Sequence, residues 1–195
     1  GGFSVYNALC ALGCTCALGI PLAAAAAALA AAPGVKGRME VVPTPGPGTV
    51  IIDYAHTPDA LENALTALRD FTPGRLICLF GCGGDRDRSK RPVMGAIAAS
   101  LADFCVVTSD NPRTEAPEAI IADILKGMDG FETPRLVEPG RPEAIRAALA
   151  MLREGDTLLL AGKGHETYQE VNGEKRHMDE RELVAEYFNK GCHLK

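Results

Sequence analysis

From residue 49 onward, short aliphatic runs alternate with longer segments of helical spacing. The runs are continuous and rich in aliphatic residues, as in strands buried on both faces of a sheet, and they cover residues 49–54, 75–80, 103–110 and 156–162. The helical segments cover 58–70, 91–101, 117–128 and 142–153, and three of them open with a proline suited to a first helical turn. This alternation predicts an α/β fold with a Rossmann-like, mainly parallel sheet and helices on both faces.

Weaker signals complete this prediction. A short strand is expected at 136–138, and a hairpin is expected to turn at Asn172-Gly173. A last helix is expected over about 179–188.

The beginning of the chain has a different character, because its first 35 residues carry no charged side chain. The apolar stretch 8–35 is long enough to raise the question of a membrane span. However, Gly19-Ile20-Pro21 interrupts it, alanine contributes little hydrophobic transfer energy, and no basic residue precedes it, as one would in a signal or anchor. We therefore expect two short alanine-rich helices.

The chain starts without a methionine, on an apolar helical pattern, and we expect it to be part of a longer protein. After Pro33 the composition changes to charged residues and then to a segment rich in proline and glycine. This change predicts two domains, 1–35 and 36–195.

Charge and cysteine content narrow the partners and the compartment. A net charge of -5 and a pI near 5.4 argue against a nucleic-acid or anionic-membrane binder. Seven cysteines with no C-x-x-C spacing predict free thiols and a cytoplasmic location rather than a disulfide framework or a zinc ribbon. Cys82 lies in a glycine-rich loop and is either a reactive thiol or a small residue tolerated there; we favour the second interpretation.

Polar and charged groups follow each of the four predicted strands, in residues 53–58, 81–92, 109–115 and 162–166. Each segment taken alone has a structural explanation, as a helix cap, a turn or solvated charges. Ligands of open parallel sheets bind beyond the carboxyl ends of the strands, so four such segments on one edge favour a binding site.

Two common nucleotide motifs do not fit these segments. In GCGGDR, Arg86 stands where the dinucleotide fingerprint requires its third glycine. Gly162-Lys163 is followed by Gly164 rather than by the Ser or Thr of a P-loop. Neither a dinucleotide site nor a self-contained ATPase is indicated.

Five separated motifs together resemble the Mur ligase family. They are GRME (37–40), DYAHTPDALE (53–62), GCGGDRDRSKRPVM (81–94), SDNPRTE (109–115) and GKGHETYQ (162–169). The resemblance implies that 36–195 is the C-terminal, amino-acid-binding domain of a three-domain ligase, and that 1–35 is the end of its central ATPase domain. The P-loop and the UDP-binding domain of the family do not occur in this chain, so the chain alone is expected to be inactive.

The implied reaction is ATP-dependent C–N bond formation in the synthesis of peptidoglycan precursors. In it, the γ-carboxylate of UDP-MurNAc-L-Ala-D-Glu is phosphorylated, and the acyl phosphate is attacked by an amine of meso-diaminopimelate. The family's catalytic residues lie in the central domain, so none is assigned here. The implied cofactors are ATP and Mg²⁺, bound mainly by that domain, and no metal site is expected in this chain.

By the same resemblance, one set of residues binds diaminopimelate. The planar fork of Arg113 suits its second carboxylate, and Glu166 suits its ammonium group. The full set is Arg86, Asp110, Asn111, Pro112, Arg113, Gly162 and Glu166. The structural alternative for Arg113 is a surface ion pair with Glu115 or Glu118.

A second set is implied to contact ATP: Asn7, Arg38, Asp53 and His56. His165 is either a general base for the amine or a residue that shapes the GKGHE loop, and the second role is favoured. His177 and His193 are expected to be solvated.

Three alternatives stay open: a lysine-adding Mur ligase, a folylpolyglutamate synthetase and a non-catalytic amino-acid-binding module. The DNPR segment (110–113) argues against both other ligases. For a lysine-adding enzyme the reason is that the charge of Arg113 would repel the side-chain ammonium of lysine. The expected partners are small molecules, with no nucleic acid and no membrane, and the protein is expected to be a monomer.

Overall fold

The computed structural model describes residues 2–191 of the chain, and of residues 2–4, 190 and 191 it describes the backbone only. The chain divides into two compact units, Gly1–Val35 and Lys36–Lys195, and each is described by itself.

The first unit consists of two helices, α1 (Gly2–Ala17) and α2 (Leu22–Ala31). Pro21 precedes α2, and Gly19 between the helices has a φ of 82°, a left-handed conformation that glycine adopts without strain. The expected pair of short alanine-rich helices is therefore confirmed. Neither these helices nor any other within residues 2–191 is long and apolar enough to cross a membrane.

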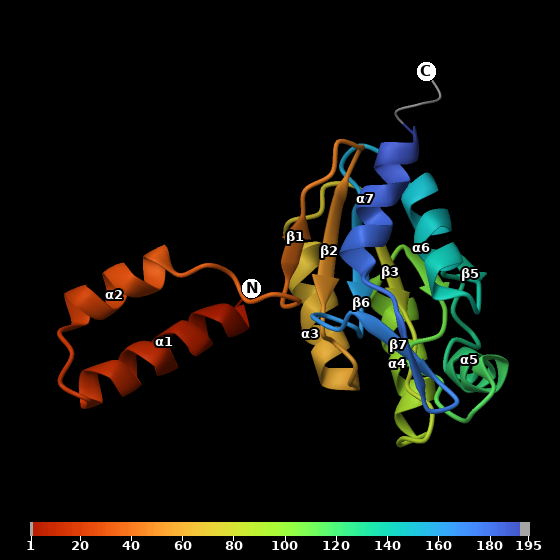
Figure 1. The fold of residues 1–195 in the computed structure, drawn as a ribbon, viewed down its shortest axis with the longest axis horizontal. Coiled ribbons are helices and arrows are strands. Elements are labelled where there is room, and N and C mark those ends of the chain that lie inside the picture. The colour runs from red at the N-terminus through yellow and green to blue at the C-terminus, as the bar shows by residue number, and fades with distance from the viewer. Residues whose placement is uncertain (1, 192–195) are drawn as a thin grey trace. The chain divides into compact units, whose positions relative to one another are not determined.

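The second unit is built on a six-stranded sheet with the order β1-β2-β6-β3-β4-β5 (Figure 1). Its strands are β1 (Glu40–Val42), β2 (Thr49–Asp53), β3 (Leu76–Phe80), β4 (Phe104–Val107), β5 (Arg135–Val137) and β6 (Thr157–Ala161). β1 pairs antiparallel with β2 at one edge, and all other pairs are parallel. The predicted mainly parallel α/β fold is confirmed.

Helices cover both faces of this sheet. They are α3 (Pro58–Arg69), α4 (Lys90–Leu101), α5 (Pro117–Lys126), α6 (Arg141–Ala150) and α7 (Glu180–Gly191). α3, α4 and α5 pack on one face, while α6 and α7 pack together on the other (Figure 1). Thr57 caps α3 by accepting the N–H of Ala60 at 3.3 Å, directly before the proline that starts this helix.

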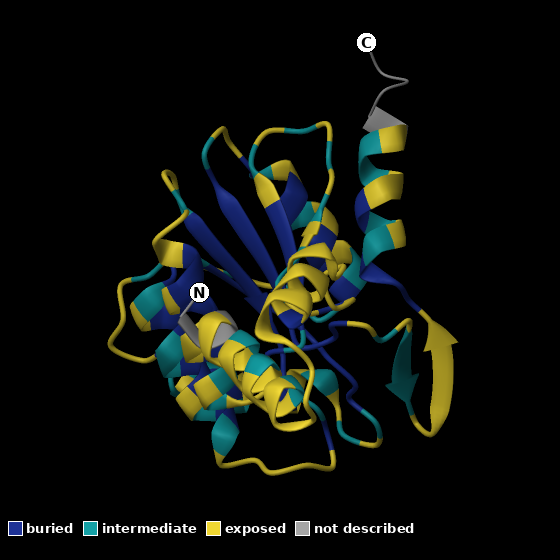
Figure 2. Cartoon of the chain, turned by 90° about the vertical axis from the view of Figure 1, so that its left-hand side faces the viewer, coloured by how far each residue is buried: buried dark blue, intermediate teal, exposed yellow. Residues whose placement is uncertain are grey.

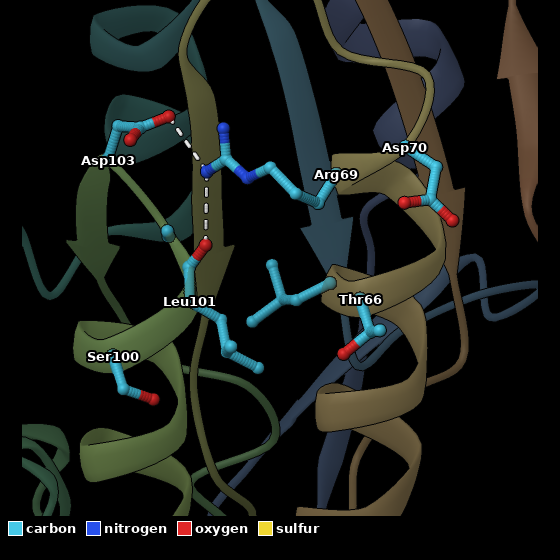
Figure 3. A pocket seen from close by; sticks show the side chains of 8 residues that line it. Thr66, Arg69, Asp70, Ser100, Leu101 and Asp103 are labelled. Carbon is cyan, nitrogen blue, oxygen red and sulfur yellow. Dashed lines mark hydrogen bonds and ion pairs between the residues drawn. The ribbon is translucent and has the colours of Figure 1, made fainter.

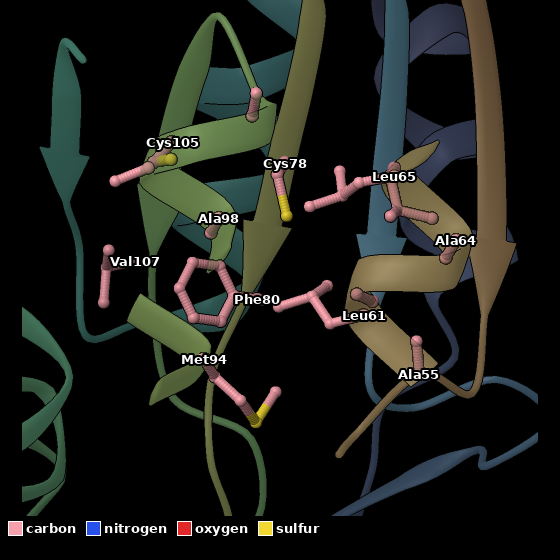
Figure 4. Packing of buried hydrophobic residues seen from close by; sticks show 14 of the residues in the cluster. Ala55, Leu61, Ala64, Leu65, Cys78, Phe80, Met94, Ala98, Cys105 and Val107 are labelled. Atoms are coloured by element: carbon pink, nitrogen blue, oxygen red, sulfur yellow. The ribbon is translucent and has the colours of Figure 1, made fainter. Parts of the chain in front are cut away.

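The strands are buried on both sides because their side chains alternate between two apolar clusters. On β3, Cys78 and Phe80 face the α3–α4–α5 side (Figure 4), whereas Ile77 and Leu79 face the α6–α7 side. All of these side chains are fully buried, and the central strands are the most buried part of the fold (Figure 2). This burial accounts for the uninterrupted aliphatic runs in the sequence.

Two strand elements lie at or outside the edge of this core. β1 was not predicted, because its three residues pair only at the sheet edge and have partly exposed side chains. The predicted hairpin is confirmed as β7 (Tyr168–Val171) and β8 (Glu174–His177), a separate antiparallel pair that turns at Asn172 and Gly173, both with positive φ. β8 is exposed along its whole length (Figure 2).

Glycine allows α4 and α5 to approach backbone to backbone. A Cβ added at Gly95 of α4 would lie 2.2 Å from the carbonyl oxygen of Ile124 in α5. A Cβ added at Gly127, just after α5, would lie 1.7 Å from the carbonyl oxygen of Pro92. Neither distance is possible for a real methyl group, so the two glycines set the spacing of these helices.

We therefore expect Gly95→Ala to destabilise the second unit by about 1–3 kcal/mol, because overpacking forces the helices apart. Helix propensity alone predicts the opposite sign, a gain of about 1 kcal/mol. Urea unfolding followed by circular dichroism measures the difference. Gly13→Ala in α1 is the matched control, since nothing lies within 4 Å of the added methyl group. A stabilising Gly95→Ala would contradict the close contact.

Candidate functional site

The segments that follow β2, β6, β3 and β4 lie beside one another at the carboxyl end of the sheet. These four strands are neighbours and run parallel, so the loops that follow them all lie at the carboxyl end of the sheet. The N–H of Gly162 donates to the carbonyl of Asp53 at 3.0 Å, and a Cβ on Gly81 would lie 2.3 Å from the carbonyl oxygen of Thr108. We call these four loops, residues 53–58, 81–92, 109–115 and 162–166, the rim.

Arg113 is held in a left-handed conformation, with a φ of 53°, by the β7–β8 hairpin. Its N–H donates to the carbonyl of Glu170 at 3.1 Å, and its carbonyl accepts the N–H of Asn172 at 2.8 Å. In the side chain, Nη1 donates to the carbonyl of Gly84 at 2.8 Å, and Nε lies 3.3 Å from Oε2 of Glu170. The carboxylate partner of Arg113 is thus Glu170, and the alternative pair with Glu115 or Glu118 is not the one observed.

Glu166 and Asn111 meet around a buried lysine. Nζ of Lys163, a residue with 0% exposure, donates to Oδ1 of Asn111 at 2.8 Å and to Oε2 of Glu166 at 2.7 Å. Nδ2 of Asn111 donates to the same Oε2 at 3.0 Å. Burial raises the pKa of Glu166, but Lys163 and Asn111 lower it more, so its pKa lies below its ordinary value and the group is a carboxylate at neutral pH.

Asp110 and Gly162 lie against each other in the same cluster. A Cβ at Gly162, whose φ is 111°, would lie 2.7 Å from Oδ2 of Asp110, so this position requires glycine. Oδ1 of Asp110 is 3.9 Å from Nζ of Lys163. Nε2 of Gln169 in β7 donates to the carbonyl of Asp110 at 2.6 Å, which fastens the hairpin to this turn.

Two further residues predicted to bind the amino acid line the loop after β3. Pro112 is buried, and its carbonyl oxygen occupies the place of a Cβ on Gly84, 1.9 Å away. Arg86 is exposed, and the hydrogen bond found for its side chain is from Nη1 to the carbonyl of Asp85 at 3.1 Å. Its guanidinium is therefore open to a ligand.

Glu115 connects the loop after β3 to the turn after β4. Its Oε1 accepts from Nη2 of the buried Arg91 at 2.8 Å and from the N–H of Asp85 at 2.7 Å. Nη2 of Arg88 lies 2.9 Å from Oε2. Arg91 and the N–H of Asp85 lower the pKa of Glu115 to about 2.

Two of the residues predicted to contact ATP from this unit, Arg38 and His56, lie in a second, aromatic cluster on the rim. The guanidinium of the exposed Arg38 lies 4.8 Å from the centroid of the Tyr54 ring, and that ring lies 4.6 Å from His56 and 5.3 Å from His165. Nδ1 of His56 is 2.8 Å from the carbonyl oxygen of Tyr54, and Nζ of Lys90 donates to the carbonyl of His56 at 2.6 Å. Both histidines are exposed.

Asp53 is nearly buried and anchors the start of the second unit. Its Oδ2 accepts the N–H of Met39 at 2.7 Å, and Met39 has a left-handed φ of 44°. Burial raises the pKa of Asp53. A Cβ on Gly37 would lie 2.2 Å from the carbonyl carbon of Gly164, so the GRME and GKGHE segments touch through their backbones.

A buried ion pair binds the backbone at the ends of two strands that lead into the rim. Arg141 and Glu180 are both fully buried, with Nε and Oε1 2.9 Å apart. The same guanidinium donates to the carbonyls of Ser109 at 3.1 Å and Ala161 at 2.8 Å, at the ends of β4 and β6.

The remaining candidate residues lie apart from the site chemistry. Cys82 is buried against Met94, with the two sulfurs 3.7 Å apart, and burial raises its pKa to about 12, so the thiol is not reactive. His177 is exposed and pairs with Glu182 at 2.6 Å, which raises its pKa. His193 lies outside the described residues. Asn7 is an exposed residue of α1, in the first unit.

A hollow of about 370 Å³ lies at the opposite end of the sheet, between the ends of α3 and α4 (Figure 3). The cation that lines it, Arg69, is already paired with Asp103 at 2.8 Å and donates to the carbonyl of Leu101 at 3.1 Å. The residues that line it come from outside the five motifs, and we assign it no role.

Sequence reasoning did not assign a role to Lys163, Glu170, Arg141 or Glu180. Lys163 stands inside the GKGHE motif, so its place in the motif was a usable signal. Arg141 and Glu180 are 39 residues apart, and no local pattern indicates that they pair.

Residues 37–164 match the family model described as Mur ligase, glutamate ligase domain. The chain therefore belongs to the Mur ligase family, and the resemblance of its five motifs is confirmed.

Named proteins are similar to this chain over most of its length. A UDP-N-acetylmuramoyl-L-alanyl-D-glutamate--2,6-diaminopimelate ligase from Thermosynechococcus vestitus is 56% identical over 184 residues, 93% of this chain and 37% of that protein. The ligase of the same name from Clostridioides difficile is 48% identical over 190 residues, 97% of this chain and 39% of that protein. The chain thus spans less than two fifths of the length of these relatives.

Two solved structures are also similar to this chain. A structure of a UDP-N-acetylmuramoyl-L-alanyl-D-glutamate--2,6-diaminopimelate ligase has a TM-score of 0.78 at 39% identity, covering 99% of this chain and 39% of that one. The UDP-N-acetylmuramate-alanine ligase of Thermotoga maritima shares the fold, with a TM-score of 0.68 at 23% identity, covering 100% of this chain and 39% of that one.

The low pKa of Glu115 leads to a pH-dependent prediction. Its carboxylate stabilises the fold at pH values above the ordinary value of 4.5, and this contribution is lost as the pH falls toward 2. Glu115→Gln should therefore unfold at lower urea concentration than wild type at pH 7, and the difference should shrink between pH 4.5 and 2.

Glu118→Gln is the control, because Glu118 is exposed in the first turn of α5. It should leave the unfolding midpoint close to that of wild type at every pH. A difference for Glu115→Gln that does not change with pH would mean that the negative charge does not hold the two loops together.

Proposed function

We propose that the protein to which this chain belongs joins meso-diaminopimelate to UDP-MurNAc-L-Ala-D-Glu in an ATP-dependent reaction. In this proposal the unit from Lys36 onward binds the incoming amino acid, and residues 1–35 are the end of the ATPase domain. The names of the relatives support this assignment.

The observation that carries the proposal is that a cation, Arg113, and an anion, Glu166, lie on two loops of the rim that Asn111 connects. Arg113 and Glu166 are linked through Asn111, which lies two residues before Arg113 and donates to Glu166 at 3.0 Å. Glu170 contacts both Asn111 and Arg113. Its N–H donates to Oδ1 of Asn111 at 2.9 Å, and its carboxylate lies against Arg113. An arginine and a carboxylate on two connected loops complement the carboxylate and ammonium of a free amino-acid end.

This complementarity separates diaminopimelate from lysine. Diaminopimelate keeps a free amino-acid end when its other amine reacts, whereas the far end of lysine has an ammonium but no carboxylate. With lysine, the Arg113 guanidinium would have no anionic partner in the ligand and would repel the ammonium. The rim therefore favours the diamino diacid.

The contribution of this unit to catalysis is positioning. An acyl phosphate is already activated, so the remaining requirement is an amine held at its carbonyl carbon in the right direction. Binding the distal end of the amino acid at Arg113, Glu166 and the neighbouring Arg86 would fix where the reacting amine lies.

ATP is proposed to meet the aromatic cluster of the rim. The exposed Arg38, which lies over the Tyr54 ring, offers charge to a phosphate, and the exposed His56 offers a hydrogen-bonding group. Asp53 is the proposed contact for a ribose hydroxyl. Asn7 stays a separate proposal for the adenine, made from the first unit. Within residues 2–191 no group of three or more His, Cys, Asp or Glu side chains could hold a metal ion, so we assign no residue here to Mg²⁺.

The test is ligation by the full-length parent protein, supplied with ATP, Mg²⁺ and UDP-MurNAc-L-Ala-D-Glu, comparing diaminopimelate with L-lysine. Wild type should prefer diaminopimelate. Arg113→Ala should lower kcat/KM for diaminopimelate by about 10- to 100-fold, since a charge-assisted hydrogen-bond pair of about 1.5–3 kcal/mol is lost. Arg113→Lys should fall between the two, because an ammonium keeps the charge without the planar fork.

Arg176→Ala is the matched control, since Arg176 is an exposed residue of β8 in the docked hairpin. It should leave both substrates unaffected. Equal use of the two amino acids by wild type would indicate a less selective ligase, and a preference for lysine would indicate a lysine-adding enzyme. Absence of ligation by the parent protein would support a non-catalytic amino-acid-binding module.

A further inference from the structure

Lys163 is a residue of the Arg113–Glu166 cluster to which the proposed function gives no task. Its side chain is fully buried, so its charge cannot reach solvent or meet a ligand at the rim. A buried ammonium is costly unless it is paired and hydrogen-bonded. Its partners are Glu166 at 2.7 Å, Asn111 at 2.8 Å and, more distantly, Asp110 at 3.9 Å.

The two oxygens of Glu166 are used differently because of this lysine. Oε2 accepts from both Nζ of Lys163 and Nδ2 of Asn111. Oε1 has no hydrogen bond to any residue in the described part of the chain, and the side chain keeps 17% exposure. The protein thus occupies one oxygen and leaves the other for a ligand.

Lys163 also fixes the orientation of the Asn111 amide. Oδ1 of Asn111 accepts from Nζ of Lys163 and from the N–H of Glu170, so the oxygen side of the amide is fully used. Nδ2 is thereby turned toward Glu166. Without the lysine, the amide and the carboxylate would lose the cation that faces them both.

We propose that Lys163 is a positioning residue for amino-acid specificity, which holds Asn111 and Oε2 of Glu166 so that Oε1 is aimed at the ammonium of the incoming amino acid. This inference rests on the proposed function, since it assigns that ammonium to Glu166. Lys163 itself does not touch the substrate.

The first test is Lys163→Met in the full-length parent protein. KM for diaminopimelate should rise by about 10-fold or more, the effect of losing one hydrogen bond to a charged group. KM for ATP and kcat at saturating diaminopimelate should stay near the wild-type values.

Lys175→Met is the matched control, because it removes a second lysine that lies over the same aromatic ring. Lys175 is exposed, and its Nζ lies 4.2 Å from the centroid of the Tyr168 ring, which Nζ of Lys163 approaches to 5.2 Å. Lys175→Met should leave KM for diaminopimelate near the wild-type value, since the contact with the ring is then lost without any change at Glu166.

A pH profile separates positioning from a general loss of structure. In wild type, Lys163 helps to keep the pKa of Glu166 below its ordinary value, so kcat/KM for diaminopimelate should not fall until strongly acidic pH. In Lys163→Met, burial without the cation raises the pKa of Glu166. The acid limb of kcat/KM should therefore move to higher pH.

A double-mutant cycle tests whether Lys163 acts through Glu166. Glu166→Gln alone should raise KM for diaminopimelate, and adding Lys163→Met to it should change KM by less than about threefold, because the two residues act as one unit. If Lys163→Met does not fold, Lys163→Gln takes its place with the same expectations, since its amide can still donate to Asn111.

Two results would overturn the inference: an unchanged KM for diaminopimelate in the Lys163 variants, or effects of Lys163 and Glu166 that simply add. Failure of the proposed function is seen separately, in wild type, as a parent protein that ligates another amino acid or none. If it ligates another amino acid, the same cycle with that substrate decides the role of Lys163. If it ligates none, the cycle is measured as binding of diaminopimelate by calorimetry.

Discussion

The burial of both faces of the parallel sheet is the constraint on which the rest of this structure depends. Parallel strands need crossover connections, and the helices in those connections cover the sheet on its two sides. Parallel strands also share one carboxyl end, which is why the loops after β2, β3, β4 and β6 all lie at the rim. The same topology places the Arg69 hollow at the opposite end, lined by residues from outside the motifs.

Within this frame, buried cations hold the loops of the rim in place. Arg91, Arg141 and Lys163 are each fully buried, and each is paired with a carboxylate. Arg91 joins the loops after β3 and β4, Arg141 joins the ends of β4 and β6, and Lys163 joins the loop after β6 to the turn after β4. Removing one partner of such a pair leaves an uncompensated charge inside the protein, so these contacts strongly favour a single arrangement of the loops.

The sequence allowed the sheet, its helices and the rim to be predicted, because each rests on local patterns. Aliphatic runs mark the buried strands, prolines mark helix starts, and Asn172-Gly173 marks the hairpin. β1 was missed because a three-residue edge strand has no periodicity to detect. The pairing of Arg113 with Glu170 was missed for another reason: it depends on where the hairpin docks, which is a property of the tertiary structure.

The selectivity proposed for this rim depends on what the protein leaves unpaired. Arg113 uses Nε and Nη1 for protein partners, while Nη2 has no hydrogen bond within residues 2–191. Glu166 likewise uses Oε2 and leaves Oε1. One donor nitrogen and one acceptor oxygen remain, each fixed by the bonds on its neighbouring atom, so little side-chain freedom is left to lose on binding. A ligand end with one carboxylate and one ammonium satisfies both, whereas an ammonium alone leaves the guanidinium unmatched.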